Sequence, residues 1–564
     1  MEPFEPRREL GVVVRGSLSK GLEMKLDPGS PIEALRAGRF VVVEGQCYDY
    51  FSMITDIALG ATSAELLDTP PDRDDALLQA VLAGTSTFGT VSLRPMIQLR
   101  KAAGGWRLSA VGAGASVGLT ADSRQPPADE LLPVKSIPPH FSPVMAATAE
   151  DVNRVFGDEE RDARYFHVGT PLDMEETPVC LDLDRFVERS NGIFGKSGTG
   201  KTFLTRIALC GIIRGDRAVN LVFDMHSEYG WQGTSESVRR PQVRGLRQYF
   251  GNRVSVFTLD PESSRRRGAK TDFHVRIPYH QVDVEDVILL QDELNLTPTA
   301  AETAYALVNE FKADWLRELL RLDPRAYCEE HNVHEGALAA LQRKLSVLAR
   351  ECDGFLRPEV TDDAVDRILA DLERGTHVVI EFGQHRSPKQ YMLVANILTR
   401  RIHQRYVERK ERALGGKEAE PRPLVITIEE AHKFLSPRLA GQTIFGTIAR
   451  EMRKYNVTLL VVDQRPSGID TEVLSQLGTK VTCLLDDDRD IDAVLAGTSG
   501  AAGLRGVLAS LETKQQALIL GHAVPMPVVI HTREYDTDEF ARSMGIRSDA
   551  ERAAAEAELR DLFA

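Results

Sequence analysis

Gly195-Lys196-Ser197-Gly198-Thr199-Gly200-Lys201-Thr202 is the stretch that decides the fold. It matches the pattern G-x-x-x-x-G-K-[ST], in which consecutive backbone N–H groups curl around the β-phosphate of a nucleoside triphosphate. The three glycines stand where a Cβ would obstruct that curl. Lys201 is then expected to contact the β- and γ-phosphates, and the Thr202 hydroxyl to ligate Mg²⁺. The stretch predicts a phosphate-binding loop for ATP.

The residues on either side of this loop support the prediction. Residues 191–194 form a short apolar run typical of a buried strand, and residues 203–210 are apolar at helical spacing. A helix that begins at the loop directs its positive end at the phosphates. A strand before the loop and a helix after it make a chance match improbable.

Hydrolysis needs acidic groups as well as a phosphate site, and residues 424–432 supply them. An apolar strand over 424–428 is followed by Glu429-Glu430-Ala431-His432. Acids at the carboxyl end of a buried strand are positioned as in open α/β sheets. We expect Glu429 to ligate Mg²⁺ and Glu430 to act as the base toward water. The alternative for these two acids is a solvated pair at the start of a helix, where the helix dipole favours negative charge. His432 is either a supporting residue of the site or an ordinary surface histidine.

A second polar group follows the next apolar strand, residues 457–462. The sequence Asp463-Gln464-Arg465-Pro466-Ser467 places the amide of Gln464 beside the presumed γ-phosphate, where it would sense whether that phosphate is present. The competing interpretation is a polar cluster that caps a turn.

Two arginines upstream of this strand, Arg450 and Arg453, lie three residues apart on one face of a predicted helix. If the protein forms a ring, one of them would reach the neighbouring subunit's site as an arginine finger, and Arg453 is the preferred candidate. Otherwise they form a basic helix surface.

Two further residues are weaker candidates for contact with the nucleotide. Asp224 ends a predicted strand, residues 220–224, and is expected to support the metal or to polarise water. Arg189, twelve residues before Lys201, is expected to approach the nucleotide from the same side, although a salt bridge would explain it equally well.

The chain of 564 residues is too long for one core and shows several predicted regions. Residues 1–120 contain short β-type runs between glycines, which predict a small barrel or sandwich. Residues 121–150 carry six prolines between 126 and 143 and are predicted to be a linker, because proline is excluded from sheet and helix interiors. Apolar runs then predict a mainly parallel α/β sheet that is interrupted by a helical insertion, within which Thr297-Pro298 is the expected start of a helix. The expected boundaries are an ATPase core in two parts, 151–281 and 374–535, an insertion over 282–373, and a helical tail over 536–564.

Composition sets limits on the function. The net charge of −14 argues against a surface that is basic throughout, but it leaves room for a local basic stripe that would bind nucleic acid. Six scattered cysteines without a C-x-x-C pair argue against a zinc site or a disulfide framework. No apolar run of membrane-spanning length and no signal pattern is present, which predicts a cytoplasmic protein without a membrane partner.

Taken together, these motifs resemble the HerA family, one of the HerA–FtsK group of hexameric P-loop motors with a RecA-like core. The resemblance rests on the P-loop, on residues 429–432, 448–455 and 464–467, and on the closing stretch 516–525, all in the family's order. Residues 10–16 and 38–44 resemble the family's amino-terminal HAS barrel. The departures are a Lys-Ser-Gly-Thr sequence inside the loop, Met452 in place of a glycine, and Asp463 where serine is frequent. None of them removes an expected catalytic group.

The resemblance implies a homohexamer that moves double-stranded DNA through its channel using ATP, with a NurA-like nuclease docked on the barrel face, in DNA end resection and recombinational repair. It implies an alternative as well, in which the ring scaffolds and activates an effector enzyme of an antiviral defence complex. A conjugation or secretion ATPase is a third possibility, which the lack of a membrane segment disfavours. The loop near Arg386 to Lys389 is the expected site of DNA contact in the channel.

Overall fold

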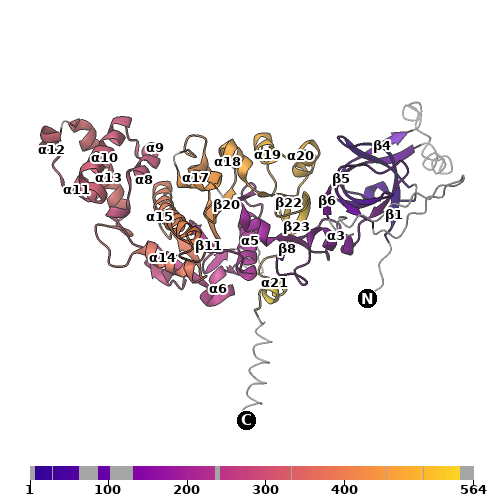
Figure 1. The fold of residues 1–564 in the computed structure, drawn as a ribbon, viewed down its shortest axis with the longest axis horizontal. Coiled ribbons are helices and arrows are strands. Elements are labelled where there is room, and N and C mark those ends of the chain that lie inside the picture. The colour runs from indigo at the N-terminus through magenta and orange to yellow at the C-terminus, as the bar shows by residue number, and fades with distance from the viewer. Residues whose placement is uncertain are drawn as a thin grey trace, which may run out of the picture. The chain divides into compact units, whose positions relative to one another are not determined.

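The computed structural model describes residues 7–27, 29–61, 87–101, 131–234, 242–331, 333–385, 387–441, 443–451, 454–498 and 501–546. The chain forms two compact units (Figure 1). The first comprises Met1–Leu181, Thr498–Glu512 and Gln516–His531, and the second comprises Asp182–Gly497, Thr513–Gln515 and Thr532–Ala564.

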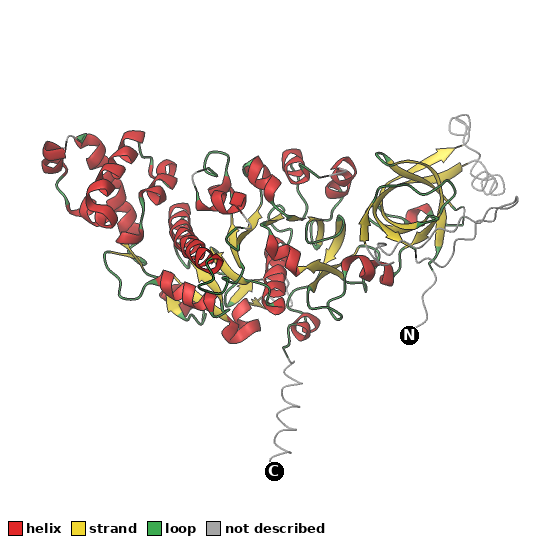
Figure 2. Ribbon diagram, in the orientation of Figure 1, coloured by secondary structure: helices red, strands yellow, loops and turns green. Residues whose placement is uncertain are grey.

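A closed antiparallel barrel forms most of the first unit (Figure 2). Its strands are β1 (Glu9–Ser17), β2 (Gly21–Leu26), β3 (Phe40–Glu44), β4 (Tyr48–Ala61), β5 (Thr87–Arg100) and β7 (Pro143–Ala146). They follow the order β2-β1-β7-β3-β4-β5, and a further pairing of β2 with β5 closes the ring. Strand β6 (Leu131–Pro133) pairs with β5 outside the ring. The amino-terminal β region predicted from the sequence is therefore a barrel.

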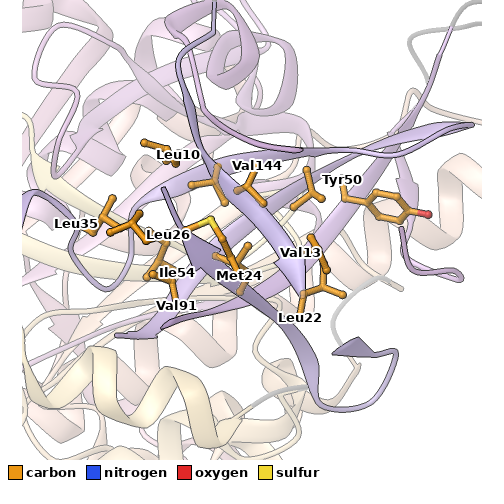
Figure 3. Close-up of a cluster of buried hydrophobic side chains, with 13 residues drawn as sticks. Leu10, Val13, Leu22, Met24, Leu26, Leu35, Tyr50, Ile54, Val91 and Val144 are labelled. Atoms are coloured by element: carbon orange, nitrogen blue, oxygen red, sulfur yellow. The ribbon is translucent and has the colours of Figure 1, made fainter. Parts of the chain in front are cut away.

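Alternation of apolar and polar residues explains the barrel core. In β2 every second residue is buried, which places Leu22, Met24 and Leu26 on the inner face. Figure 3 shows these side chains packed with residues from neighbouring strands, among them Val13 and Val144. The barrel thus has a hydrophobic core of its own.

The linker predicted over residues 121–150 is wrong for the part that the structure describes. Strands β6 and β7 lie in this proline-rich segment, and β7 is inserted between β1 and β3. Pro143 is the first residue of β7 and Pro133 the last of β6, positions where a missing N–H is tolerated. Prolines at strand ends therefore did not prevent this segment from completing the barrel.

The first unit also contains elements that follow the barrel strands. They are α3 (Ala149–Phe156), β8 (Tyr165–Pro171), β9 (Val179–Asp182), α20 (Ala501–Ala509), β22 (Gln516–Gly521) and β23 (Val528–Thr532). Helix α3 begins with a capping box, in which Thr148 and Asp151 satisfy each other's backbone N–H groups. Strands β22 and β23 are antiparallel neighbours.

A parallel sheet forms the centre of the second unit. Its strands, in spatial order, are β15 (Phe273–His274), β14 (Val254–Thr258), β18 (His377–Glu381), β11 (Val219–Asp224), β19 (Leu424–Glu429), β20 (Val457–Asp463), β10 (Asn191–Phe194) and β21 (Thr479–Thr482). Each strand is parallel to its neighbours. Every residue of β11, β19 and β20 is buried, as expected for strands covered on both faces.

Helices accompany these strands along the chain (Figure 1). They are α4 (Leu183–Glu188), α5 (Lys201–Gly215), α6 (Leu246–Phe250), α7 (Pro261–Arg266), α15 (Pro388–Leu414), α16 (His432–Leu435), α17 (Ile444–Glu451), α18 (Thr471–Gln476), α19 (Asp488–Leu495) and α21 (Asp538–Ser543). The α/β P-loop core predicted from the sequence is confirmed.

The helical insertion is present between β14 and β18. Its helices are α8 (Val284–Leu289), α9 (Gln291–Leu294), α10 (Pro298–Phe311), α11 (Trp315–Arg321), α12 (Pro324–His331), α13 (Glu335–Glu351) and α14 (Ala364–Glu373). Helix α10 starts as predicted, because the Thr297 side chain accepts from the Ala300 N–H and Pro298 occupies the first turn. Buried Asp286 of α8 accepts from Asn396 and Arg400 of α15 and so joins the insertion to the sheet's covering helix.

Parts of two predicted regions lie outside the described residues: residues 62–86 and 102–120 of the amino-terminal β region, and residues 547–564 of the carboxyl-terminal tail. Within the described ranges, no helix combines the length and the apolar character needed to cross a bilayer.

Candidate active site

The glycine loop joins β10 to α5, as the sequence predicts. Gly195 has φ +153°, and a Cβ there would lie 2.7 Å from the Cys483 Cβ and 2.8 Å from the Thr199 hydroxyl oxygen. Only glycine fits this position beside β21. Gly200 adopts a left-handed conformation and provides no side chain to cap α5, which leaves the first N–H groups of the helix available to an anion.

Contacts inside the loop converge on one carbonyl. The Lys196 carbonyl oxygen accepts from Lys201 Nζ at 2.7 Å and from the Thr199 hydroxyl at 2.8 Å. The Lys196 side chain forms an ion pair with Asp486, N to O 2.8 Å, which fixes the loop to the segment after β21. Burial lowers the pKa of Lys201, whereas the nearby acids Glu430 and Asp463 act in the opposite direction. The loop is therefore a preformed cradle with its lysine folded along it.

Four adjacent strands end in buried acids, which we call the strand-end acids: Glu381 of β18, Asp224 of β11, Glu429 of β19 and Asp463 of β20. Because the strands are parallel, their carboxyl ends meet at one edge of the sheet, where the loop after β10 also lies. Burial raises the pKa of Glu381 and of Asp224. This edge therefore gathers carboxyl groups at the end of the sheet where the phosphate cradle lies.

Glu429 fits the role of a metal ligand. One carboxylate oxygen accepts from the Tyr229 hydroxyl at 2.7 Å, and the other is buried without a hydrogen-bond partner among the described residues. Burial, followed by the charge of Asp224, raises the pKa of Glu429 to about 8. A buried oxygen that lacks a donor is where a hard cation such as Mg²⁺ would compensate the desolvation.

Glu430 differs from Glu429 in both backbone and surroundings. Its φ of +49° is left-handed, which is uncommon for a residue with a side chain and recurs at functional sites. Its carboxylate is only partly buried and accepts from Gln464 Nε2 at 3.1 Å. The structure thus brings together two candidate residues, Glu430 and Gln464, that lie 34 positions apart.

His432 belongs to the same cluster. Its backbone N–H donates to Asp463 at 2.7 Å, and its ring Nδ1 lies 2.9 Å from the same carboxylate. The hydrogen bond to Asp463 raises the pKa of His432. Of the two interpretations of His432 left open by the sequence, the supporting role fits these contacts. His432 is a partner of the Asp463 carboxylate.

Asp224 lies close to Glu429 but is used elsewhere. Its two carboxylate oxygens accept from the backbone N–H groups of Glu228 at 2.8 Å, Tyr229 at 2.8 Å and Gly230 at 3.2 Å. These bonds shape the loop that carries Tyr229. Asp224 therefore supports the site through that loop.

The structure does not bring Arg189 to the loop. Arg189 ends α4 and precedes β10, so the length of that strand, about 13 Å for four residues, separates it from the glycine loop. Its side chain packs against Gly478, at the amino end of β21. The expectation that Arg189 approaches the nucleotide from the same side is wrong, because twelve residues along the chain include a full strand.

Arg450 is engaged within its own chain. Its Nε donates to Glu472 at 3.1 Å and one terminal nitrogen donates to the Ala440 carbonyl at 3.1 Å, which ties α17 to α18. Arg453 lies outside the described residues. Of the two candidate fingers, Arg450 already has an intramolecular role.

Three residues at this edge of the sheet were missed by sequence reasoning. All three are buried: Tyr229, Tyr391 and Glu381. The local sequence around each of them does not differ from that of an ordinary core strand, helix or strand end. A signal existed only for Glu381, which ends an apolar strand in the same way as Glu429 does.

Known proteins match this chain over much of its length. Residues 166–402 match the family model described as "Helicase HerA, central domain". The DNA double-strand break repair helicase HerA of Sulfolobus acidocaldarius is 30% identical over 402 residues, which cover 70% of this chain and 73% of that protein. The protein of the same name from Pyrococcus furiosus is 23% identical over 407 residues, 67% of this chain and 71% of that one.

Two solved structures also resemble the chain. VirB4 of Thermoanaerobacter pseudethanolicus has a TM-score of 0.42 at 13% identity and covers 66% of this chain and 97% of its own. The bacterial conjugative coupling protein TrwB has a TM-score of 0.44 at 12% identity and covers 69% of this chain and 92% of its own.

Proposed function

This chain belongs to the HerA family, and from that premise we propose that it is a ring-forming motor that moves double-stranded DNA using ATP. It is an ATP-hydrolysing P-loop enzyme. The observation that carries the proposal is the juxtaposition, at one edge of the sheet, of the glycine loop, the strand-end acids and the Glu430–Gln464 pair.

We assign the chemistry residue by residue. The loop from Gly195 to Gly200 and Lys201 hold the phosphates of ATP, and Thr202 and Glu429 hold Mg²⁺. When bound, Mg²⁺ would neutralise negative charge on the phosphate oxygens. Glu430 accepts the proton of the attacking water through its carboxylate, which is more accessible than that of Glu429. Gln464 orients Glu430 through their hydrogen bond and reports on the γ-phosphate.

The acidic composition does not oppose DNA binding, because the charge is unevenly distributed. Residues 282–373 contain 21 acidic and 9 basic residues, a net charge of −12 out of −14 for the chain. The remaining residues are therefore almost neutral in sum, and a basic stripe among them is compatible with the total.

Such a stripe occurs in and after α7, as Arg265 and Arg266 followed by Lys270. Arg265, Arg266 and Lys270 are exposed, and Lys270 Nζ lies 5.6 Å from the centre of the Trp231 ring. We propose this segment as a contact for DNA phosphates. It takes precedence over the loop near Arg386 to Lys389, because Arg386 is outside the described residues and Lys389 forms an ion pair with Glu351.

We propose the oligomeric state from the resemblance to the HerA family. We expect a homohexamer in which Arg453 reaches the neighbouring site, since Arg450 is bonded to Glu472. The matched relatives are named for DNA double-strand break repair, which favours a NurA-like nuclease as partner over an effector of antiviral defence.

ATP turnover with and without duplex DNA tests the proposal. The native mass of the purified protein, measured together with its neighbouring gene product, first establishes the ring and its partner. Duplex DNA should then raise turnover in the verified ring, and the stimulation should fall with salt as phosphate contacts are screened. Turnover that is the same with and without DNA at low salt, with the partner present, would refute the assignment.

A further inference from the structure

One hydroxyl group satisfies both backbone groups of Glu429. Tyr391, in the first turns of α15, accepts from the Glu429 N–H and donates to the Glu429 carbonyl, each at 3.1 Å. The Tyr391 side chain is fully buried. A hydroxyl can do this because it carries one donor hydrogen and two acceptor lone pairs.

The hydroxyl stands where a neighbouring strand ends. Strands β11 and β19 are paired as far as Phe223 and Ile428, one residue before Glu429. Beyond that point the chain after β11 turns into the loop whose N–H groups bond to Asp224. Backbone groups buried without a partner are strongly disfavoured, and Tyr391 supplies the missing donor and acceptor.

The residue after this contact is Glu430, whose backbone is left-handed. Such a conformation in a residue with a side chain persists only where the surroundings fix it. Tyr391 fixes the residue before it, and the Lys433 N–H donates to the Glu430 carbonyl at 2.9 Å after it. Hydrogen bonds therefore hold the backbone both before Glu430 and at its own carbonyl.

The ring of Tyr391 has little freedom to move away. It packs edge-on against Phe382, with ring centres 5.1 Å apart, and against Phe434, with ring centres 5.3 Å apart. Phe382 follows β18, and Phe434 lies in α16. We propose that Tyr391 is a positioning residue that sets the orientation of Glu430 through the backbone of Glu429.

This inference rests on the role proposed for Glu430 and is tested in the full-length assembled protein by Tyr391→Phe. We expect kcat for ATP to fall by about tenfold or more, while KM and the affinity for ATP change by less than about twofold, as for an interaction that acts in the chemical step. Tyr406→Phe is the matched control, because it removes a buried tyrosine hydroxyl from the same helix about 22 Å further along, and it should retain kcat.

A double-mutant cycle separates positioning from a structural effect. If Tyr391 acts through Glu430, Tyr391→Phe should not lower the residual turnover of Glu430→Gln any further. An equal loss in both backgrounds, or an unchanged kcat in Tyr391→Phe, would overturn the inference. If Tyr391→Phe does not assemble, Phe382→Leu keeps the hydroxyl but frees the ring: a lower kcat with unchanged KM supports the inference, and an unchanged kcat overturns it.

The Tyr391 test can succeed or fail independently of the proposal that the protein moves DNA. Basal turnover of ATP suffices for the comparison of Tyr391→Phe with Tyr406→Phe, whether or not duplex DNA stimulates the wild type. A wild-type ring that hydrolyses ATP without responding to DNA would remove the motor assignment and leave the Tyr391 test intact.

Discussion

Gln464 Nε2 donates a hydrogen bond to Glu430 across 3.1 Å, and the two residues come from the ends of neighbouring parallel strands. One carboxylate oxygen of Glu430 is thereby directed, and the other lies 3.8 Å from His432 Nδ1. The pair joins the candidate base to the candidate phosphate sensor in one contact. It is the part of the site on which the assignment of hydrolysis depends.

Glu430→Gln keeps the size of this side chain and one acceptor oxygen for Gln464 but removes its basicity. We expect ATP to bind with near wild-type affinity and kcat to fall by about 10² or more, the usual contribution of a general base. Binding of a fluorescent ATP analogue and steady-state turnover measure the two quantities. Glu359→Gln, a change at an exposed carboxylate of the insertion, is the control. Retained turnover in Glu430→Gln would place the base elsewhere.

The two arginines of residues 448–455 should behave differently in mixed rings. Arg453→Ala subunits should depress the activity of rings containing wild-type subunits by more than their share, because a finger acts on the neighbouring site. Arg450→Ala should mainly lower thermal stability, and Glu472→Ala should do the same, because the two side chains bond to each other within one chain. Titration of mutant into wild-type subunits provides the measurement. Strictly proportional loss with Arg453→Ala would confine this residue to its own subunit.

The basic segment after β14 should determine affinity for DNA. The double change Arg265→Glu and Arg266→Glu should weaken binding of duplexes of any sequence, and it should lower the slope of log affinity against log salt by about one for each phosphate that is no longer neutralised. Arg321→Glu with Arg325→Glu, an equal charge change at exposed positions of the acidic insertion, should leave that slope unchanged. If the two double variants bind DNA equally well, the segment does not contact DNA.

The buried side chain of Lys480 should make the free energy of unfolding depend on pH. It is buried in β21, its Nζ donates to the Val494 carbonyl at 2.9 Å, and burial lowers its pKa to about 8. The unfolded chain holds this proton up to a pKa of about 10.4, so folding at neutral pH is opposed by a buried charge, by on the order of 3 kcal/mol. This destabilisation is therefore at its full value below about pH 8. It decreases as the pH rises from 8 and is absent above about pH 10.4, where Lys480 is neutral in both the folded and the unfolded chain.

Lys480→Met should accordingly raise the free energy of unfolding at pH 7 and flatten its rise between pH 8 and 10. Denaturant unfolding at several pH values measures both effects. A variant that loses stability at pH 7 would mean that the hydrogen bond to Val494 outweighs the buried charge.

Local patterns were sufficient for the glycine loop and for the start of α10. The residues from Asn191 to Thr202 carry a strand, a turn and a helix start in sequence, so no distant contact is needed to recognise them. The same holds for Thr297-Pro298, where the cap and the proline are adjacent.

Features that depend on distant contacts were not predictable in this way. Strand β7 exists because the barrel needs a partner between β1 and β3, and its proline marks a strand start only in that context. Arg189 is near Lys201 in sequence but separated from it by a strand. Tyr391 is one apolar position among many on α15 until β19 is placed beside it.

Displacement of a third strand from a triplex on duplex DNA is the most direct test of the motor assignment, because it reports ATP-driven movement along double-stranded DNA without requiring strand separation. We expect the assembled wild-type ring to displace the third strand in the presence of ATP and Mg²⁺, and Glu430→Gln to bind the same DNA without displacing it. Wild-type rings that bind the duplex and hydrolyse ATP, yet leave the triplex intact with the partner protein present, would contradict the assignment.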